Sequence, residues 1–152
     1  MARTSIIILA LLMEICFCLP DSVNGQEDDD SKTKIAELIR DIDKNPNRLH
    51  RNYTPAVDAL IKIGPPAIKP LLDVMQDERE VTRRRAQTAL VDITMISQGW
   101  QPGRPWADPN GEAKWREFWK SLGNLQWDAS KEDREKSIKQ WQIWLSNQPN
   151  PK

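Results

Sequence analysis

The chain has 152 residues, and its 22 Lys and Arg residues balance 22 Asp and Glu residues, so the formal net charge is zero. A neutral chain offers no electrostatic basis for binding nucleic acid. The only cysteines are Cys16 and Cys18, and His50 is the single histidine, so thiol and imidazole chemistry have almost no residues to use. We therefore expect a non-catalytic protein with no cofactor and no metal site.

Residues 1–25 have the pattern of a secretory signal peptide. Arg3 precedes an apolar run at residues 6–19, which only Glu14 interrupts, and small and polar residues lead to Gly25. The run is shorter than the about 20 apolar residues that span a bilayer. We expect cleavage after Gly25, a secreted or periplasmic location, and no stable membrane span in the product. Residues 26–33 then form an acidic, flexible N-terminus.

Residues 34–98 predict four amphipathic helices. Ser31 is the expected N-cap of the first, which Asn45 and Pro46 end. The apolar residues of this helix recur at helical spacing: Ile35, Leu38, Ile39 and Ile42. The second helix begins after Thr54 as N-cap and ends at Gly64.

The third and fourth helices follow from the same signals. Pro65 and Pro66 open the third helix, and Pro70 within its first turns makes it start late or bend. The fourth helix follows a polar turn at residues 77–80 and ends before Gly99. Its apolar residues are Val81, Ala86, Ala89, Leu90 and Ile93.

An internal repeat relates these helices in pairs. A shift of 30 residues lays the second helix on the fourth, matching Ala56, Ala59, Leu60 and Ile63 with Ala86, Ala89, Leu90 and Ile93. A shift of 33 residues lays the first helix on the third, matching Ile35, Leu38, Ile39 and Ile42 with Ile68, Leu71, Leu72 and Met75. A helix pair that recurs at this period is typical of an α-solenoid. The alternative is two unrelated amphipathic helix pairs.

Part of this repeat region resembles a known repeat family. Residues 55–72 are similar to the joint between two HEAT repeats of the short type also found in phycobilisome lyases, through the motifs Ala59-Leu60-x-x-Ile63-Gly64 and Ala67-Ile68-x-x-Leu71-Leu72. Residues 77–93 resemble the second helix of that repeat, with Thr82 where the repeat usually carries Val. The resemblance implies a protein-binding scaffold without catalytic residues, in which Arg83 pairs locally with Asp77 or Glu80.

All seven tryptophans lie between residues 100 and 144. The prolines and glycines of residues 99–111 predict a loop. Residues 112–146 predict two further helices, the second with Ser130 as N-cap, and residues 147–152 a flexible tail. The expected fold is therefore all-α: a short HEAT-like α-solenoid of two helix pairs, closed by a Trp-rich C-terminal pair.

The tryptophans have two possible roles, in the core or in recognition. Trp115, Trp119, Trp141 and Trp144 lie on helical stripes, which predicts that they pack in the core. Trp100, Trp106 and Trp127 lie outside strong stripes and are the candidate binding residues, with core packing as the equal alternative.

The charged residues favour surface roles. Consecutive arginines at 83–85 fan out over about 200° of a helix, so they do not form one compact patch. Asp92 and the other helical aspartates lie on polar faces, which predicts solvated side chains. The sequence as a whole thus predicts an exported scaffold that binds an unidentified protein partner. The alternative is a glycan or cell-wall binding module that uses exposed tryptophans.

Overall fold

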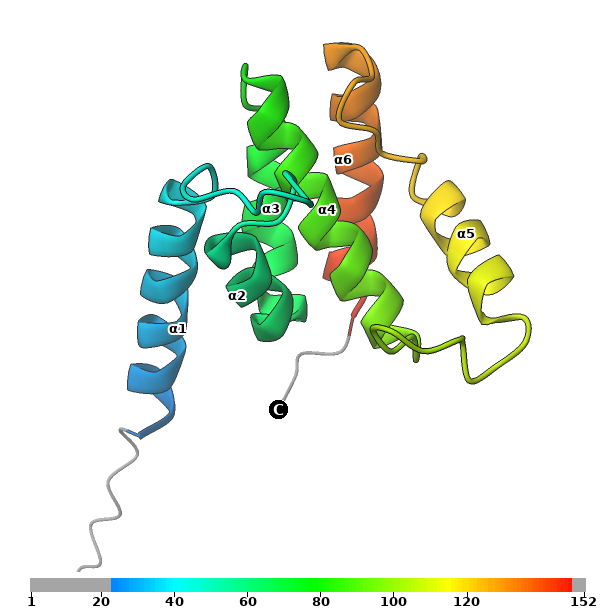
Figure 1. Cartoon of the computed structure of the whole chain (residues 1–152), viewed down its shortest axis with the longest axis horizontal. Helices are drawn as coiled ribbons and strands as arrows, with labels where there is room; N and C mark the ends of the chain where they lie inside the picture. The colour runs from blue at the N-terminus through cyan, green and yellow to red at the C-terminus, as the bar shows by residue number, and fades with distance from the viewer. Residues whose placement is uncertain (1–22, 149–152) are drawn as a thin grey trace, which may run out of the picture.

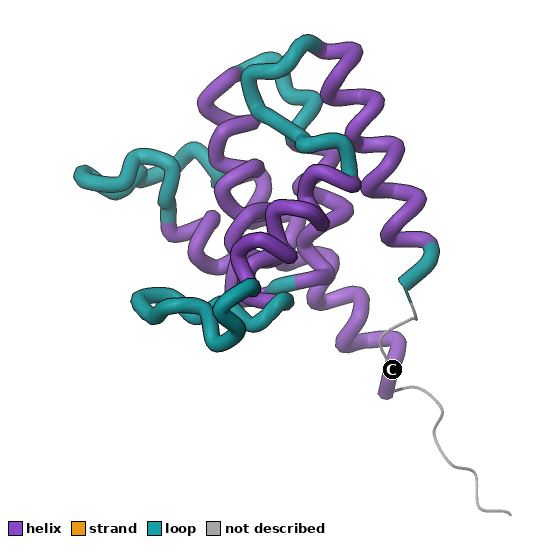
Figure 2. Tube along the Cα trace, turned by 90° about the vertical axis from the view of Figure 1, so that its right-hand side faces the viewer, coloured by secondary structure: helices purple, strands orange, loops and turns teal. Residues whose placement is uncertain are grey.

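The computed structural model describes residues 23–148, and in that part of the chain every regular element is helical (Figure 2). The α-helices are α1 (Val23–Arg40), α2 (Pro55–Ile63), α3 (Ile68–Val74), α4 (Glu80–Ser97), α5 (Gly111–Ser121) and α6 (Lys131–Ser146), with a 3₁₀ turn η1 (Pro65–Ala67) before α3. The predicted all-α class is confirmed. Among these helices, none has the length and apolar character needed to cross a membrane.

Helix α1 begins earlier than the sequence predicted. It starts at Val23 rather than after a cap at Ser31, so residues 26–33, expected to be flexible, belong to the helix. The expected signal peptide at residues 1–25 lies almost entirely outside the described residues. The expected tail at residues 147–152 also lies mostly outside them.

The predicted capping residues act as expected at α2 and α6. The Thr54 hydroxyl accepts the backbone N–H of Val57 at 3.1 Å, and the Ser130 hydroxyl accepts that of Asp133 at 3.1 Å. Gly64 ends α2 with a φ of 77°, a conformation that favours glycine. The prolines after it form η1, so α3 starts late.

The helices pack in two rows (Figure 1). Helix α1 packs on α2 and α3, α2 packs on α4, and α3 packs on both α4 and α6. One row is therefore α1, α3 and α6, and the other begins with α2 and α4. Helix α5 lies further out beyond α4, which it reaches through a hydrogen bond from Trp115 Nε1 to the Thr94 hydroxyl at 3.0 Å.

One hydrophobic core runs from α1 to α6. Aliphatic side chains such as Leu60, Leu71 and Leu90 are fully buried between α2, α3 and α4. Each contributes about 1.5–3 kcal/mol by leaving water. Trp119 and Trp141 belong to the same core, so the C-terminal helices share it with the first four.

Tryptophan rings join α5 to α6. The ring centroids of Trp119 and Trp141 lie 5.1 Å apart, and those of Phe118 and Trp144 lie 5.2 Å apart, both edge to face. Trp119 and Trp141 are buried, while Trp115 and Trp144 are half-buried against the core. The core role predicted for these four tryptophans is confirmed.

Candidate functional site

The three consecutive arginines near the start of α4 make different contacts: Arg83 and Arg84 both reach Trp127, and Arg85 reaches the loop between α1 and α2. Arg83 donates from Nε to the carbonyl oxygen of Trp127 at 2.8 Å, and from Nη1 to the carbonyl oxygens of Asp77 and Glu78, each at 2.8 Å. Arg83 therefore pairs locally with Asp77, as expected, but through the backbone carbonyl oxygen of that residue and not through its carboxylate. Arg83 also ties the turn before α4 to the loop before α6.

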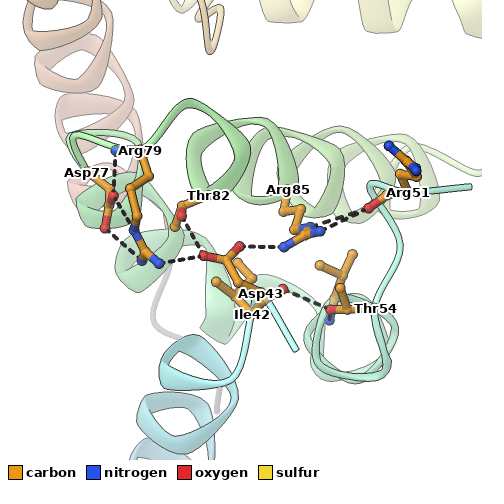
Figure 3. Close-up of polar contacts among 9 residues, drawn as sticks. Ile42, Asp43, Arg51, Thr54, Asp77, Arg79, Thr82 and Arg85 are labelled. Carbon is orange, nitrogen blue, oxygen red and sulfur yellow. Dashed lines mark hydrogen bonds and ion pairs between the residues drawn. The ribbon is translucent and has the colours of Figure 1, made fainter. Parts of the chain in front are cut away.

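Arg85 is buried and holds the loop between α1 and α2. Asp43 in this loop accepts a hydrogen bond from Arg85 Nη1 at 2.6 Å and one from the Thr82 hydroxyl at 2.6 Å, and it pairs with Arg79 at 2.9 Å (Figure 3). Arg85 also donates to the carbonyl oxygen of Arg51 at 3.3 Å. Thr82 thus has a specific polar partner. The network fixes the loop over the first turns of α4.

Arg84 lies over the ring of Trp127. Its Cζ atom is 3.9 Å from the ring centroid, a cation–π contact, and its Nη2 donates to the Glu80 carboxylate at 2.9 Å. The Nε atom of Arg84 is buried and has no hydrogen-bond partner. Buried donors without an acceptor are rare in folded proteins.

Helix α4 positions Trp127 through its backbone. The Trp127 N–H donates to Gln87 Oε1 at 2.6 Å, and its carbonyl oxygen accepts from Arg83. The side-chain amide of Gln87 also donates to Gln126 Oε1 at 3.2 Å. The ring is therefore fixed before any ligand arrives.

A groove runs along the exposed side of α4. It consists of three depressions with volumes of about 600, 510 and 380 Å³. The first and second share Asn52 and Arg84, and the second and third share Gln87 and Val91, so the three are adjacent along α4. We call them together the α4 groove. Its lining residues are Pro46, Asn47, Arg48, Arg51, Asn52, Tyr53, Glu80, Val81, Arg84, Arg85, Gln87, Thr88, Val91, Asp92, Trp115, Arg116, Trp119, Lys120, Asn124, Gln126 and Trp127.

Asp92 is half-buried in the second depression and is not the solvated side chain that the sequence predicted. The Tyr53 hydroxyl donates to Asp92 Oδ2 at 2.9 Å. Burial raises the pKa of the Asp92 carboxyl above its ordinary value. Burial, together with the bond to Asp92, raises the pKa of Tyr53 to about 12. Tyr53 therefore stays protonated at neutral pH and occupies one oxygen of Asp92.

The three candidate binding tryptophans have different positions. Trp127 lines the α4 groove, whereas neither Trp100 nor Trp106 does. Trp106 packs on the first residue of α5, where a Cβ atom on Gly111 would lie 2.5 Å from its ring. The backbone N–H of Trp100 donates to the carbonyl oxygen of Met95 at 3.0 Å after the end of α4. All three side chains are half-buried.

The sequence interpretation missed most of the groove. Arg84, Gln87 and Val91 follow each other at three- and four-residue spacing, so they form a stripe on one side of α4. That stripe is visible in the sequence, and its half-buried state is not. Tyr53 carried no signal, because it lies in the loop before α2 and its partner Asp92 lies in α4.

The groove offers hydrogen-bond donors from arginines and side-chain amides, the ring of Trp127, and two acids, Glu80 and Asp92. Such a lining is suited to holding a polar, extended chain. Within residues 23–148, no group of three or more His, Cys, Asp or Glu side chains could hold a metal ion. Comparison with protein-family models, curated proteins and solved structures finds no match to this chain.

Proposed function

We propose that this chain is an exported, non-catalytic scaffold of the short HEAT-repeat type that binds an extended segment of a partner protein in the α4 groove. The observation that carries the proposal is the row of adjacent depressions along α4, in which Arg84 stacks on the Trp127 ring beside the first two depressions. Fixed arginine and tryptophan side chains are typical anchors of protein interfaces, because little side-chain freedom is lost on binding.

The packing of α1 to α4 supports the repeat. Helix α1 packs on α3 and α2 packs on α4, as neighbouring repeats do. Residues paired by the internal shifts are buried together, for example Leu60 with Leu90 and Ile42 with Met75. In the first two helix pairs, the first helix of each pair, α1 or α3, lies in the same row. In the C-terminal pair the second helix, α6, lies in that row, so this pair closes the array with its two helices in the opposite order.

Two sequence features support the rest of the proposal. The apolar run at residues 6–19 supports export, and the scarcity of histidine and thiols supports a binding role over catalysis. The groove follows α4 from Glu80 to Asp92, a length of about 18 Å at the helical rise. An extended chain covers that length with about five residues.

The proposal is tested by site-specific photo-crosslinking. A photo-reactive residue replaces Thr88, which lines the second depression, or Gln142, which is exposed on α6 outside the groove. Each variant of the full chain is exposed to an envelope extract of the source cells. We expect a protein adduct from position 88 only, and its loss when Trp127→Ala is added. No adduct, or the same adducts from both positions, would contradict binding in the groove.

The second depression also has a lining that sugars can use, because Trp127 lies beside Asn52 and Gln87 there. Sugars stack on open aromatic faces, however, and Arg84 already covers one face of this ring. We therefore prefer the protein ligand. A shift of tryptophan emission on adding a polysaccharide, abolished by Trp127→Phe, would reverse that preference.

A further inference from the structure

The first depression of the α4 groove carries a concentrated positive charge on a chain whose net charge is zero. Four of its nine lining residues are arginines, and one is a glutamate. Arg85 is neutralised by Asp43, and Arg84 shares its charge with Glu80. Arg48 and Arg51 are exposed, and within residues 23–148 no carboxylate pairs with either of them.

The segment that carries these two arginines is held in a defined conformation. The Asn47 side-chain oxygen accepts the backbone N–H groups of Leu49 and His50 at 2.9 and 3.2 Å. The backbone N–H of Asn47 donates to the carbonyl oxygen of Tyr53 at 2.9 Å, which closes the loop. The carbonyl oxygen of Arg51 is bound by the buried Arg85. The turn therefore presents its arginine side chains from a fixed backbone.

We propose that this first depression binds carboxylate side chains of an acidic segment of the partner protein. The inference rests on the proposed function and names the chemistry of the bound segment. Carboxylates match the arrangement because the exposed guanidinium groups of Arg48 and Arg51 lack an anion among the described residues. Charge complementarity of this kind sets specificity and register along a groove.

The second depression determines how the bound segment is placed along the groove. Asp92 already accepts the Tyr53 hydroxyl there, and its charge disfavours a second carboxylate beside it. The acidic residues of the partner thus lie at the Arg48 end, and an uncharged side chain lies against Trp127. The bound segment is acidic at one end only.

The test is a fluorescence-anisotropy titration of the full chain. The probe is a fluorescein-labelled peptide of about six residues, acidic in its first half and with a leucine in its second. The comparison peptide carries Asn and Gln in place of Asp and Glu. We expect binding of the acidic peptide only, weakened at least about tenfold by Arg48→Gln together with Arg51→Gln. Raising the salt from about 50 to about 300 mM should weaken binding as well.

The matched control is Arg40→Gln together with Arg104→Gln, which removes the same charge from exposed positions outside the groove. Equal weakening by both double variants would overturn the inference, because net charge alone would then explain binding. Equal binding of the two peptides would overturn it too. Heparin is the third probe: if heparin binds through Arg48 and Arg51 and the acidic peptide does not, the ligand is a sulfated glycan and the inference is wrong.

This failure is distinguishable from failure of the proposed function. If position 88 crosslinks to a partner protein while the acidic peptide does not bind, the scaffold function stands and only the acidic ligand is overturned. If position 88 does not crosslink to a protein and the acidic peptide does not bind, both the proposed function and this inference are overturned. Arg48 and Arg51 contribute no side-chain bonds to the fold among the described residues, so the double variant should keep its circular-dichroism spectrum.

Discussion

Helices α1 to α4 pack through aliphatic side chains, whereas α5 is joined to its neighbours mainly by tryptophan rings. Leu60 and Leu90 are fully buried between closely packed helices. In contrast, α5 lies further out (Figure 1). Its side chains Trp115 and Trp119 reach the hydrophobic core. Small side chains let helix backbones approach, and large rings keep them apart.

The difference explains where the α4 groove comes from. Because α5 is held away from α4, the space between them remains open as the third depression, which Trp115 and Trp119 line. The loop from α5 to α6 then returns to α4 and places Trp127 beside Arg84. Helix α4, from the aliphatic half, thus forms the base of the α4 groove, and residues of the aromatic half form one of its sides.

The largest loss of stability should come from a charged substitution in the aliphatic core of α1 to α4. Leu90 is fully buried in α4, so Leu90→Asp places a charge where no partner can reach it. We expect loss of the helical circular-dichroism signal at all temperatures. Lys62→Ala, a change at an exposed position of α2, should leave the melting temperature unchanged. A folded Leu90→Asp variant would contradict the core described here.

A smaller effect should come from the aromatic half. Trp141 is fully buried, and Trp141→Ala should lower the free energy of unfolding by about 3–5 kcal/mol. Trp141→Phe should cost less, because the indole Nε1 is buried without a hydrogen-bond partner and its removal loses no bond.

The same variants show whether the two halves unfold together. All seven tryptophans lie between residues 100 and 144, so fluorescence reports the C-terminal half while circular dichroism reports every helix. Since one core joins the halves, we expect both signals to change at one temperature in Trp141→Ala. A fluorescence transition well below the circular-dichroism transition would mean that α5 and α6 form a separate unit.

The halves also differ in how far their structure could be predicted from the sequence. Helix starts at Thr54 and Ser130 were predictable, because a capping side chain acts on a backbone N–H three residues away. Most of the groove was not, because its contacts join distant positions. Tyr53 and Asp92 are 39 positions apart, and Arg85 and Asp43 are 42 apart.

The tryptophan candidates show the same limit. Trp127 was identified because it lies outside a helical stripe, but so do Trp100 and Trp106, which pack elsewhere. What distinguishes Trp127 is its backbone bonds to Gln87 and Arg83, and no local pattern encodes them.

The smallest effect concerns the acid in the groove. The folded state raises the pKa of Asp92 above its value in the unfolded chain, so folding becomes less favourable as pH rises through the range in which the carboxyl ionises. Asp92→Asn removes this charge and keeps an oxygen that can accept the Tyr53 hydroxyl. At pH 7 we expect a gain in the free energy of unfolding of no more than about 1 kcal/mol, because Asp92 is still partly exposed to water.

The pH dependence of the stability gain tests whether it comes from removing the Asp92 charge or from a change of side-chain contacts. Below pH of about 3 the Asp92 carboxyl is protonated in both states, so the gain should vanish. Thermal melts of both proteins at pH 3 and at pH 7 provide the measurement, with Asp73→Asn on the exposed side of α3 as control. A lower melting temperature for Asp92→Asn at pH 7 would instead make Asp92 a structural acid like Asp43. A gain at pH 7 would mean that the chain retains a charged acid in its groove at the expense of stability, as binding sites often do.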